Sequence, residues 1–318
     1  GAQHLQVNAH GSLSATTALG SIKEKAPIAY EQTGKPVPVS FVLDNDILSF
    51  ATAAYKGTLI IDPVIEWGSY FGGTANEAGM DITNDKWGNV YLCGSTNSVA
   101  NIATVGAHQV TFAGAANDAF LSKWNSDGAL IWSTYYGGAN VDIARGVACD
   151  TLGNVYMGGN TTSATGISTI GSFQEVLDLG NDAFLIKMDS SGIRSWGTYF
   201  GGSNHDAQSS FAMSIDAANN LYLVGNTQSN NLPSTLNTHQ PTHGGGHDAF
   251  ISRWNTQGEL IWCTYYGGAG ADYGNGVVCD SSGNIFLAGY TQSATGIATA
   301  NAYQTTNGGG QDAFVAML

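Results

Sequence analysis

A motif of seven residues recurs four times along this chain at an almost constant interval. It reads Trp-Gly-Ser-Tyr-Phe-Gly-Gly at its first occurrence, and every later copy keeps the Trp, a Tyr and the Gly-Gly pair. The copies begin at Trp67, Trp132, Trp196 and Trp262, so the steps are 65, 64 and 66 residues. Tandem repeats of this kind indicate one supersecondary unit used several times, in which neighbouring units bury a common core.

Each repeat is predicted to contain four β-strands. In the second repeat we expect them over residues 144–150, 155–160, 182–189 and 193–200. The third strand has apolar residues at alternate positions, Phe184, Ile186 and Met188, which fall on one face. Two further markers keep the same period: an Asp-Ala-Phe triplet from Asp118, Asp182, Asp248 and Asp312, and a Thr-x-Ser triplet from Thr96, Thr161, Thr227 and Thr291.

Four antiparallel strands per repeat, with glycine and aromatic residues at fixed places, are typical of a β-propeller blade. One such blade cannot bury both of its faces, whereas stacked blades can. Glycine makes up 43 of the 318 residues, nearly twice the usual share of about 7%, as tight turns between short strands require. A solenoid is disfavoured because its coils are usually shorter, about 20–45 residues. The predicted fold is therefore all-β: a propeller of four-stranded antiparallel blades behind a small β module.

The small β module is expected over residues 1–62, and the propeller repeats over residues 63–318. Asp62-Pro63 separates the two parts, since proline has no N–H to donate to a sheet. Short strands are predicted in the module over residues 5–8, 28–32, 37–43, 48–54 and 58–61. The propeller part is expected to contain a strand over 64–71 and units over about 77–136, 142–200, 206–266 and 272–318.

The two ends of the repeat array suggest how a propeller could close. Ile65–Phe71 reads as a fourth strand without its first three, and the last unit reads as three strands that finish with residues 312–318. If these two segments pair, three whole blades and one shared blade make a closed ring of four. The alternative, equally open, is that the array belongs to a longer chain with more blades.

The succession of motifs resembles the bacterial SBBP beta-propeller repeat family. In the second repeat these motifs are Trp132–Gly138, Asp150–Tyr156, Thr161–Ser163, Gln174 and Asp182–Phe184, and residues 64–318 share the pattern. Residues 26–32 and 59–64 also resemble the small domain that commonly precedes such repeats. The resemblance implies secreted or surface proteins, often multidomain, in bacteria including Bacteroidetes-type organisms. It implies seven blades, where this sequence holds four repeats, and it brings no catalytic residues.

Charge excludes one class of partner. The chain has ten Lys and Arg residues against 24 Asp and Glu residues, a formal net charge of −14. Such a surface repels a phosphate backbone, so nucleic-acid binding is not expected. No apolar run approaches the 18 or more residues of a membrane span, so no direct membrane span is expected either.

The four cysteines show no CxxC spacing. Cys149 and Cys279 occupy the same place in two repeats, and Cys93 and Cys263 lie in other apolar strand patterns. Buried free thiols, which behave as small apolar side chains, are the expected state. A disulfide between neighbouring strands is the alternative.

Four acidic residues recur in register where the chain enters the first strand of each unit. They are Glu77, Asp142, Asp206 and Asp272, each four residues after the Gly-Gly pair. If these strands line a central channel, the carboxylates form a ring that could bind Ca²⁺, which prefers several oxygen ligands. The alternative is that each carboxylate accepts backbone N–H groups in its own turn.

The remaining acidic positions are predicted to form turns. Asp85, Asp150, Asp216 and Asp280 each precede a turn of the Asp-x-x-Gly-Asn kind. Glycoside cleavage would need a unique pair of carboxylates in one cleft, and nothing in the sequence marks out any Asp as non-repetitive.

The sequence therefore predicts a non-catalytic extracellular module that binds, adheres or acts as a scaffold. It would recognise a glycan or a surface protein, and it could be joined to other domains of a longer chain. The long polar connections near residues 97–117, 162–181, 228–247 and 292–311 are candidates for recognition; alternatively, they only cover the outer edges of the blades. A carbohydrate-active enzyme on a propeller scaffold and a structural subunit of a surface assembly are the alternative functions.

Overall fold

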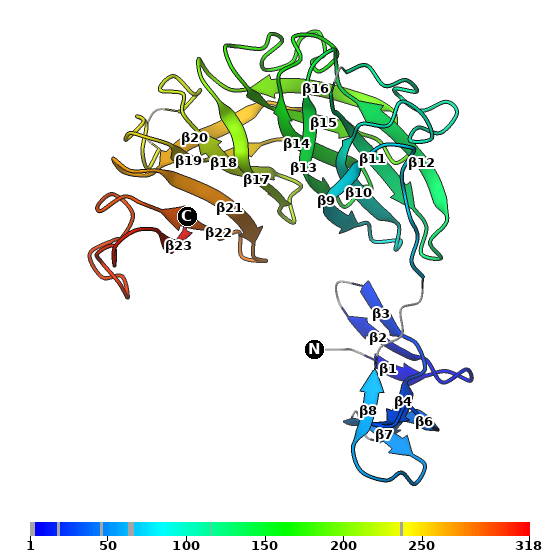
Figure 1. Ribbon diagram of the computed structural model, residues 1–318. Helices are drawn as coiled ribbons and strands as arrows, with labels where there is room; N and C mark the ends of the chain where they lie inside the picture. Colours follow the sequence, from blue (N-terminus) through cyan, green and yellow to red (C-terminus); the bar gives the residue numbers. More distant parts are fainter. Residues whose placement is uncertain (1–3, 18–19, 45–46, 63–66, 115, 236–237) are drawn as a thin grey trace. The chain divides into compact units, whose positions relative to one another are not determined.

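The computed structural model describes residues 4–17, 20–44, 47–62, 67–114, 116–235 and 238–318, and in these ranges it contains strands and turns but no helix. The all-β prediction is thus confirmed. The chain divides into two compact units, Gly1–Ser69 and Tyr70–Leu318 (Figure 1). The described residues contain no helix long and apolar enough to cross a membrane.

The first unit contains three small antiparallel sheets. Their core includes Leu13, Ala29, Val37 and Phe41, and the ring of Phe41 lies 5.4 Å from that of Phe50. Five strands were predicted close to where they occur, whereas β2 and β3 were not expected. The sheets are β1 (His4–Val7), β2 (Leu13–Thr17) and β3 (Gly20–Glu24); β5 (Pro36–Val37), β4 (Ile28–Glu31) and β8 (Leu59–Asp62); and β6 (Val39–Asp44) with β7 (Ile47–Thr52).

The second unit contains four antiparallel sheets, one for each repeat, as the period of the sequence predicted. Within a sheet, consecutive strands are neighbours, joined by tight turns and one long connection. The first three sheets have four strands: β9 (Glu77–Asn84), β10 (Val90–Thr96), β11 (Asp118–Trp124) and β12 (Leu130–Tyr136); β13 (Asp142–Cys149), β14 (Val155–Thr161), β15 (Asp182–Met188) and β16 (Arg194–Phe200); β17 (Asp206–Ile215), β18 (Leu221–Thr227), β19 (Asp248–Trp254) and β20 (Leu260–Tyr266). The last sheet has three: β21 (Asp272–Cys279), β22 (Ile285–Thr291) and β23 (Asp312–Met317).

The four sheets follow one another along an arc, like successive blades (Figure 1). The first strands of the blades, β9, β13, β17 and β21, lie on the inner, concave side and contact one another in that order. The fourth strands lie on the outer side. This arrangement places the first-strand residues of different repeats within reach of one ligand.

The core lies between blades and is built in the same way at each junction. We call the side of a blade that faces the next repeat its forward face, and the other side its backward face. At the second junction, Tyr156 and Leu185 of the forward face pack on Phe250 and Trp254 of the next blade, and all four side chains are almost completely buried. Since every apolar face needs a neighbouring blade, the stability of one repeat depends on the next.

The strand expected over residues 64–71 is not observed in its described part. Residues 63–66 lie outside the described residues, and residues 67–71 are irregular. The last sheet ends at β23, which pairs with β22 among the described residues. Closure into a four-bladed ring and continuation into more blades both stay predictions.

Candidate functional site

The structure holds each member of the predicted acidic ring within its own blade. Asp142 accepts hydrogen bonds from the Gly138 N–H (2.8 Å) and from the hydroxyls of Thr161 and Ser163. Asp206 and Asp272 have the same three partners in their repeats. Glu77 accepts from the Gly73 N–H and from the Thr96 hydroxyl.

These bonds explain why the Thr-x-Ser and Gly-Gly motifs keep the same interval. The Thr and the Ser end the second strand, the Gly-Gly pair precedes the first, and the carboxylate joins them. Among the described residues, no group of three or more His, Cys, Asp or Glu side chains is arranged to hold a metal ion. The geometry therefore agrees with the alternative in which each carboxylate accepts hydrogen bonds in its own turn. It does not bring Glu77, Asp142, Asp206 and Asp272 together as a ring.

A different acidic arrangement occurs at the junctions, where carboxylates meet in pairs. A Cβ atom placed on Gly201 would lie 2.5 Å from Oδ1 of Asp182 and 2.9 Å from Oδ2 of Asp206. Both carboxyls are fully buried, and Asp182 Oδ1 has no hydrogen-bond partner among the described residues. Burial raises the pKa of Asp182 to about 7 and that of Asp206 to about 6. Asp248 and Asp272 approach Gly267 in the same way.

The second acidic set forms turns, as predicted. In the first repeat, Asp85 Oδ1 accepts from the N–H groups of Trp87 and Asn89, while Oδ2 accepts from the Asn89 amide and the Tyr91 hydroxyl. The turns at Asp150, Asp216 and Asp280 repeat the two backbone bonds and the bond from the Asn amide. In the last of them, the hydrogen bond from the Asn284 amide lowers the pKa of Asp280.

The long connections run along the outer strands. In the second repeat, Thr169 N–H donates to the carbonyl of Gly197, and Tyr199 N–H donates to the carbonyl of Gln174. The Gln174 side chain accepts from the Gly201 N–H and donates to Asp182, and the side chain of Ile167, a residue of the connection itself, is fully buried. For the part of the connections that the structure describes, these contacts agree with the alternative in which the connections cover the outer edges of the blades. A role for them in recognition stays a prediction.

The repeat is broken at one place on the concave side. Asp206 and Asp216 are ten residues apart, whereas the corresponding acids of the other three repeats are eight apart. The two extra residues form a bulge: β17 pairs with β18 at Asp206, and regular pairing resumes at Phe211. Ala207 has a φ of 54°, which is unusual for a residue with a side chain. The Asn226 side chain accepts from the N–H groups of Ser209 and Ser210 and so holds the bulge in place.

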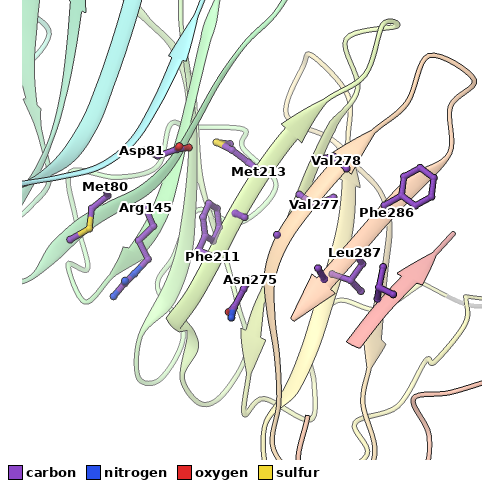
Figure 2. Close-up of a pocket in the computed structure, with 14 residues that line it drawn as sticks. Met80, Asp81, Arg145, Phe211, Met213, Asn275, Val277, Val278, Phe286 and Leu287 are labelled. Atoms are coloured by element: carbon purple, nitrogen blue, oxygen red, sulfur yellow. The ribbon is translucent and has the colours of Figure 1, made fainter. Parts of the chain in front are cut away.

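A pocket of about 570 Å³ lies beside this bulge, where the inner strands face the concave side (Figure 2). Arg145 borders it and reaches across the junction, donating from Nε to the Asn160 side chain (2.7 Å) and from Nη2 to the Gln208 carbonyl (2.8 Å). The other principal lining residues come from three further blades: Met80 and Asp81 of β9, Phe211 and Met213 of β17, Asn275 and Val277 of β21, and Leu287 of β22.

The chemistry of the pocket is that of a binding surface with one cation. A guanidinium has five N–H donors, and two of those on Arg145 are engaged as described. Asp81 is the carboxylate of the lining, and both of its oxygens accept backbone hydrogen bonds, from Ile82 and Val147. Beside these groups, Phe211, Met213 and Met80 provide apolar surface. Sequence reasoning missed this site, although the changed Asp206–Asp216 spacing was its signal.

Comparison with known proteins agrees with the architecture. Residues 131–166 and 261–296 match a family described as Beta-propeller repeat, SBBP, and residues 1–64 match a Domain of unknown function (DUF7948). With its tandem four-stranded sheets, the chain is a repeat protein of the β-propeller class. Two of its repeats thus match the SBBP beta-propeller repeat family, which its sequence motifs resemble.

A comparison with curated proteins found no match. A solved structure described as a protein of unknown function from Dyadobacter fermentans DSM 18053 has 10% sequence identity and a TM-score of 0.36. That similarity covers 91% of this chain and 74% of the other.

Proposed function

We propose that this protein is a non-catalytic binding module that holds a glycan or another protein on the concave side of its blade array. The observation that carries this proposal is the coincidence of three features at one place: the bulge in β17, the Arg145 guanidinium and the pocket of about 570 Å³. Bulges commonly occur next to functional sites, where they redirect a side chain. The bulge also distinguishes this place on the concave side from the corresponding places in the other repeats.

The pocket favours a ligand with an apolar face and a hydrogen-bond acceptor. The aliphatic face of a sugar ring, or an apolar side chain, fits against Phe211 and Met213, while Arg145 donates to a hydroxyl or a carboxylate. The net charge of −14 opposes a highly anionic polymer. The expected ligand is therefore neutral or carries isolated carboxylates.

Binding is favoured over catalysis by the state of Asp81. Acid–base cleavage of a glycoside needs two carboxyl groups on either side of the bond. The described lining of the pocket offers Asp81, whose two oxygens are already engaged by backbone N–H groups. We further propose that the module acts outside the cell or at a bacterial surface, as the family resemblance implies.

A screen of immobilised oligosaccharides, both neutral and uronic-acid-containing, tests the proposal, with hits confirmed by calorimetry. Arg145→Gln and Asn275→Trp are expected to weaken binding of a confirmed glycan at least tenfold. Val105→Asp, at a fully exposed position outside the pocket, serves as the control and should leave binding unchanged. If loop substitutions abolish binding while the pocket variants do not, the site is wrong. If the protein releases new reducing ends from the glycan, the enzyme alternative is correct.

A further inference from the structure

The third repeat departs from the common pattern at a histidine as well as at its bulge. The residue just before the Asp-Ala-Phe triplet is Asn117, Asn181 or Gln311 in the other repeats, but it is His247 in the third. The same repeat contains the two-residue bulge of β17. One side chain, that of Asn226 in β18, contacts both the bulge and this histidine.

The Asn226 side chain is fully buried, and its oxygen anchors the bulge. Oδ1 accepts hydrogen bonds from the N–H groups of Ser209 (3.0 Å) and Ser210 (2.9 Å), and the Ser210 hydroxyl donates to it at 3.2 Å. These three donors assign the orientation of the amide, with its oxygen towards the bulge. The amide nitrogen, Nδ2, therefore points away from the bulge and can only donate.

His247 lies where Nδ2 of Asn226 donates. The ring atom Nδ1 of His247 is 3.3 Å from Nδ2. Because an amide nitrogen only donates, Nδ1 is the acceptor of the ring, and a neutral imidazole then carries its hydrogen on Nε2. Nε2 lies 2.9 Å from the end of the Gln228 side chain, whose amide oxygen accepts this hydrogen when the amide is turned towards the ring. A neutral histidine thus keeps Asn226 in the orientation that anchors the bulge.

The surroundings of His247 favour this neutral state. Burial lowers the pKa of His247, and the imidazoles of His243 and His205 lower it further. The ring of Tyr273, in the next blade, lies 5.0 Å away. The carboxyl groups of the surrounding elements are engaged by His243 or by groups of their own blades; they are Asp248, Asp206 and Asp272.

We propose that His247 is a pH-sensitive switch for the concave site, which releases the bulge when Nδ1 takes up a proton. A protonated imidazole has two N–H donors, so the new Nδ1–H meets the N–H of Asn226. Rotation of the Asn226 amide restores a hydrogen bond, because it brings Oδ1 to the ring. The N–H groups of Ser209 and Ser210 then face Nδ2 and lose their acceptor.

The consequence for ligand binding rests on the function proposed above. Gln208, which precedes Ser209 in the bulge, supplies the carbonyl oxygen to which Arg145 Nη2 donates at 2.8 Å. Phe211, just after the bulge, lines the pocket (Figure 2). A released bulge therefore frees the guanidinium and shifts the apolar lining. A ligand of the pocket should bind near neutral pH and dissociate in a mildly acidic medium.

Hydrogen exchange measured without any ligand tests the switch. Protection factors, from which the intrinsic effect of pH on exchange is removed, are compared at Ser209 and Ser210 between pH 7.5 and 5.5. An unperturbed histidine titrates near pH 6.5, so protection of the bulge should fall by up to about tenfold over this interval. Amides of β14, in the neighbouring blade, should not change.

Two substitutions taken from the second repeat separate His247 from its neighbour. His247→Asn introduces the residue found at Asn181 and should remove the pH dependence of the bulge. His243→Leu introduces the residue found at Leu177 and should retain it. Protection that is independent of pH in the parent protein, or that still falls in His247→Asn, overturns the proposal.

Asn226→Asp distinguishes rotation of the amide from movement of the ring. A carboxylate keeps an acceptor for Ser209 and Ser210 and offers its second oxygen to a protonated His247. Protection in this variant should therefore rise as the pH falls, and a further fall would contradict the amide rotation. The ring moves instead if protection in the parent protein is unchanged while His247 titrates, as followed by its NMR chemical shift, and that result also overturns the switch.

Binding measurements separate the switch from the proposed function. A glycan confirmed at the pocket should bind up to about tenfold more weakly at pH 5.5 than at pH 7.5 in the parent protein, and equally at both in His247→Asn. If the bulge opens in acid but no ligand binds at the pocket, the switch stands and the proposed function is wrong. If a ligand binds there and the bulge does not respond to pH, the function stands and the switch is wrong.

Discussion

Arg145 of the second blade donates a hydrogen bond from Nη2 to the carbonyl oxygen of Gln208, 2.8 Å away in the third blade. Gln208 lies in the two-residue bulge, so this bond joins the feature that breaks the repeat to the neighbouring sheet. Burial lowers the pKa of Arg145, yet an arginine stays protonated in proteins. The bond is thus a charged one, and it fixes both the bulge and the edge of the pocket.

Removal of the guanidinium should therefore loosen the bulge. We expect Arg145→Ala to lower the free energy of unfolding by about 1.5–3 kcal/mol, the usual range for hydrogen bonds to charged groups, as measured by urea denaturation. Amide hydrogen exchange should become faster at Ser209 and Ser210 in particular. Asn275→Ala, at an exposed position lining the same pocket, is the control and should change neither measurement. Equal protection of the bulge amides in both variants would contradict this role of Arg145.

The buried pair of Asp182 and Asp206 predicts a stability that falls as the pH rises. In an unfolded chain an aspartic acid titrates near pH 4, whereas burial raises the pKa of Asp182 to about 7. Between these values the folded chain binds the extra proton, so raising the pH favours unfolding. The stabilisation from this group is complete below about pH 4 and is lost as the pH passes 7. The titratable groups that also face the pair are Asp178 and His205.

Asp182→Asn tests this dependence, because an amide stays neutral at every pH. The variant should have a higher Tm than the parent at pH 8, and the difference should shrink towards pH 5. Asp189→Asn provides the contrast: although partial burial opposes it, hydrogen bonds from Ser191 and Ile193 lower the pKa of Asp189, so that substitution should not flatten the profile. A parent protein whose Tm is constant from pH 5 to 8 would contradict the prediction.

The repeat predicted most of the blade architecture because its motifs are the hydrogen-bonding groups themselves. In the second repeat the expected strand over 155–160 is observed as Val155–Thr161, and that over 193–200 as Arg194–Phe200. The Thr-x-Ser and Asp-x-x-Gly-Asn motifs hold the ends of these strands. In the first unit, β2 is built from Leu13-Ser-Ala-Thr-Thr17, a stretch with too little apolar alternation to indicate a strand.

The candidate site was beyond what the repeat could predict. Identical motifs predict identical local structure. The recurring acidic residues therefore suggested a shared site, whereas each of them makes hydrogen bonds within its own blade. The pocket arises instead where one repeat differs, at the bulge between Asp206 and Phe211, and from the curvature that brings four blades to one concave side. Curvature depends on the packing of whole blades, which no single motif contains.

Glycine at one position of the second strand is required by the bulge in the first. A Cβ on Gly159 would lie 1.9 Å from the carbonyl oxygen of Ile143, where the register of β13 and β14 shifts. We expect Gly159→Ala to lower the free energy of unfolding by more than about 3 kcal/mol, at the upper end for single substitutions. Gly276→Ala, with open space around it, should change it by less than about 0.5 kcal/mol. Similar urea midpoints for the two variants would show that the strands can separate at little cost.

The repeat also provides a matched pair of core substitutions. Leu185 and Val315 occupy the same place in the second and last blades, but Leu185 is fully buried against the third blade and Val315 is 78% exposed. Leu185→Ala leaves a cavity at a junction, so the free energy of unfolding should fall by about 2–5 kcal/mol. Val315→Ala should cost less than about 0.5 kcal/mol in dilute protein, as exposed positions do. Equal losses of stability in the two variants, measured by urea denaturation, would contradict the burial of Leu185 at the junction.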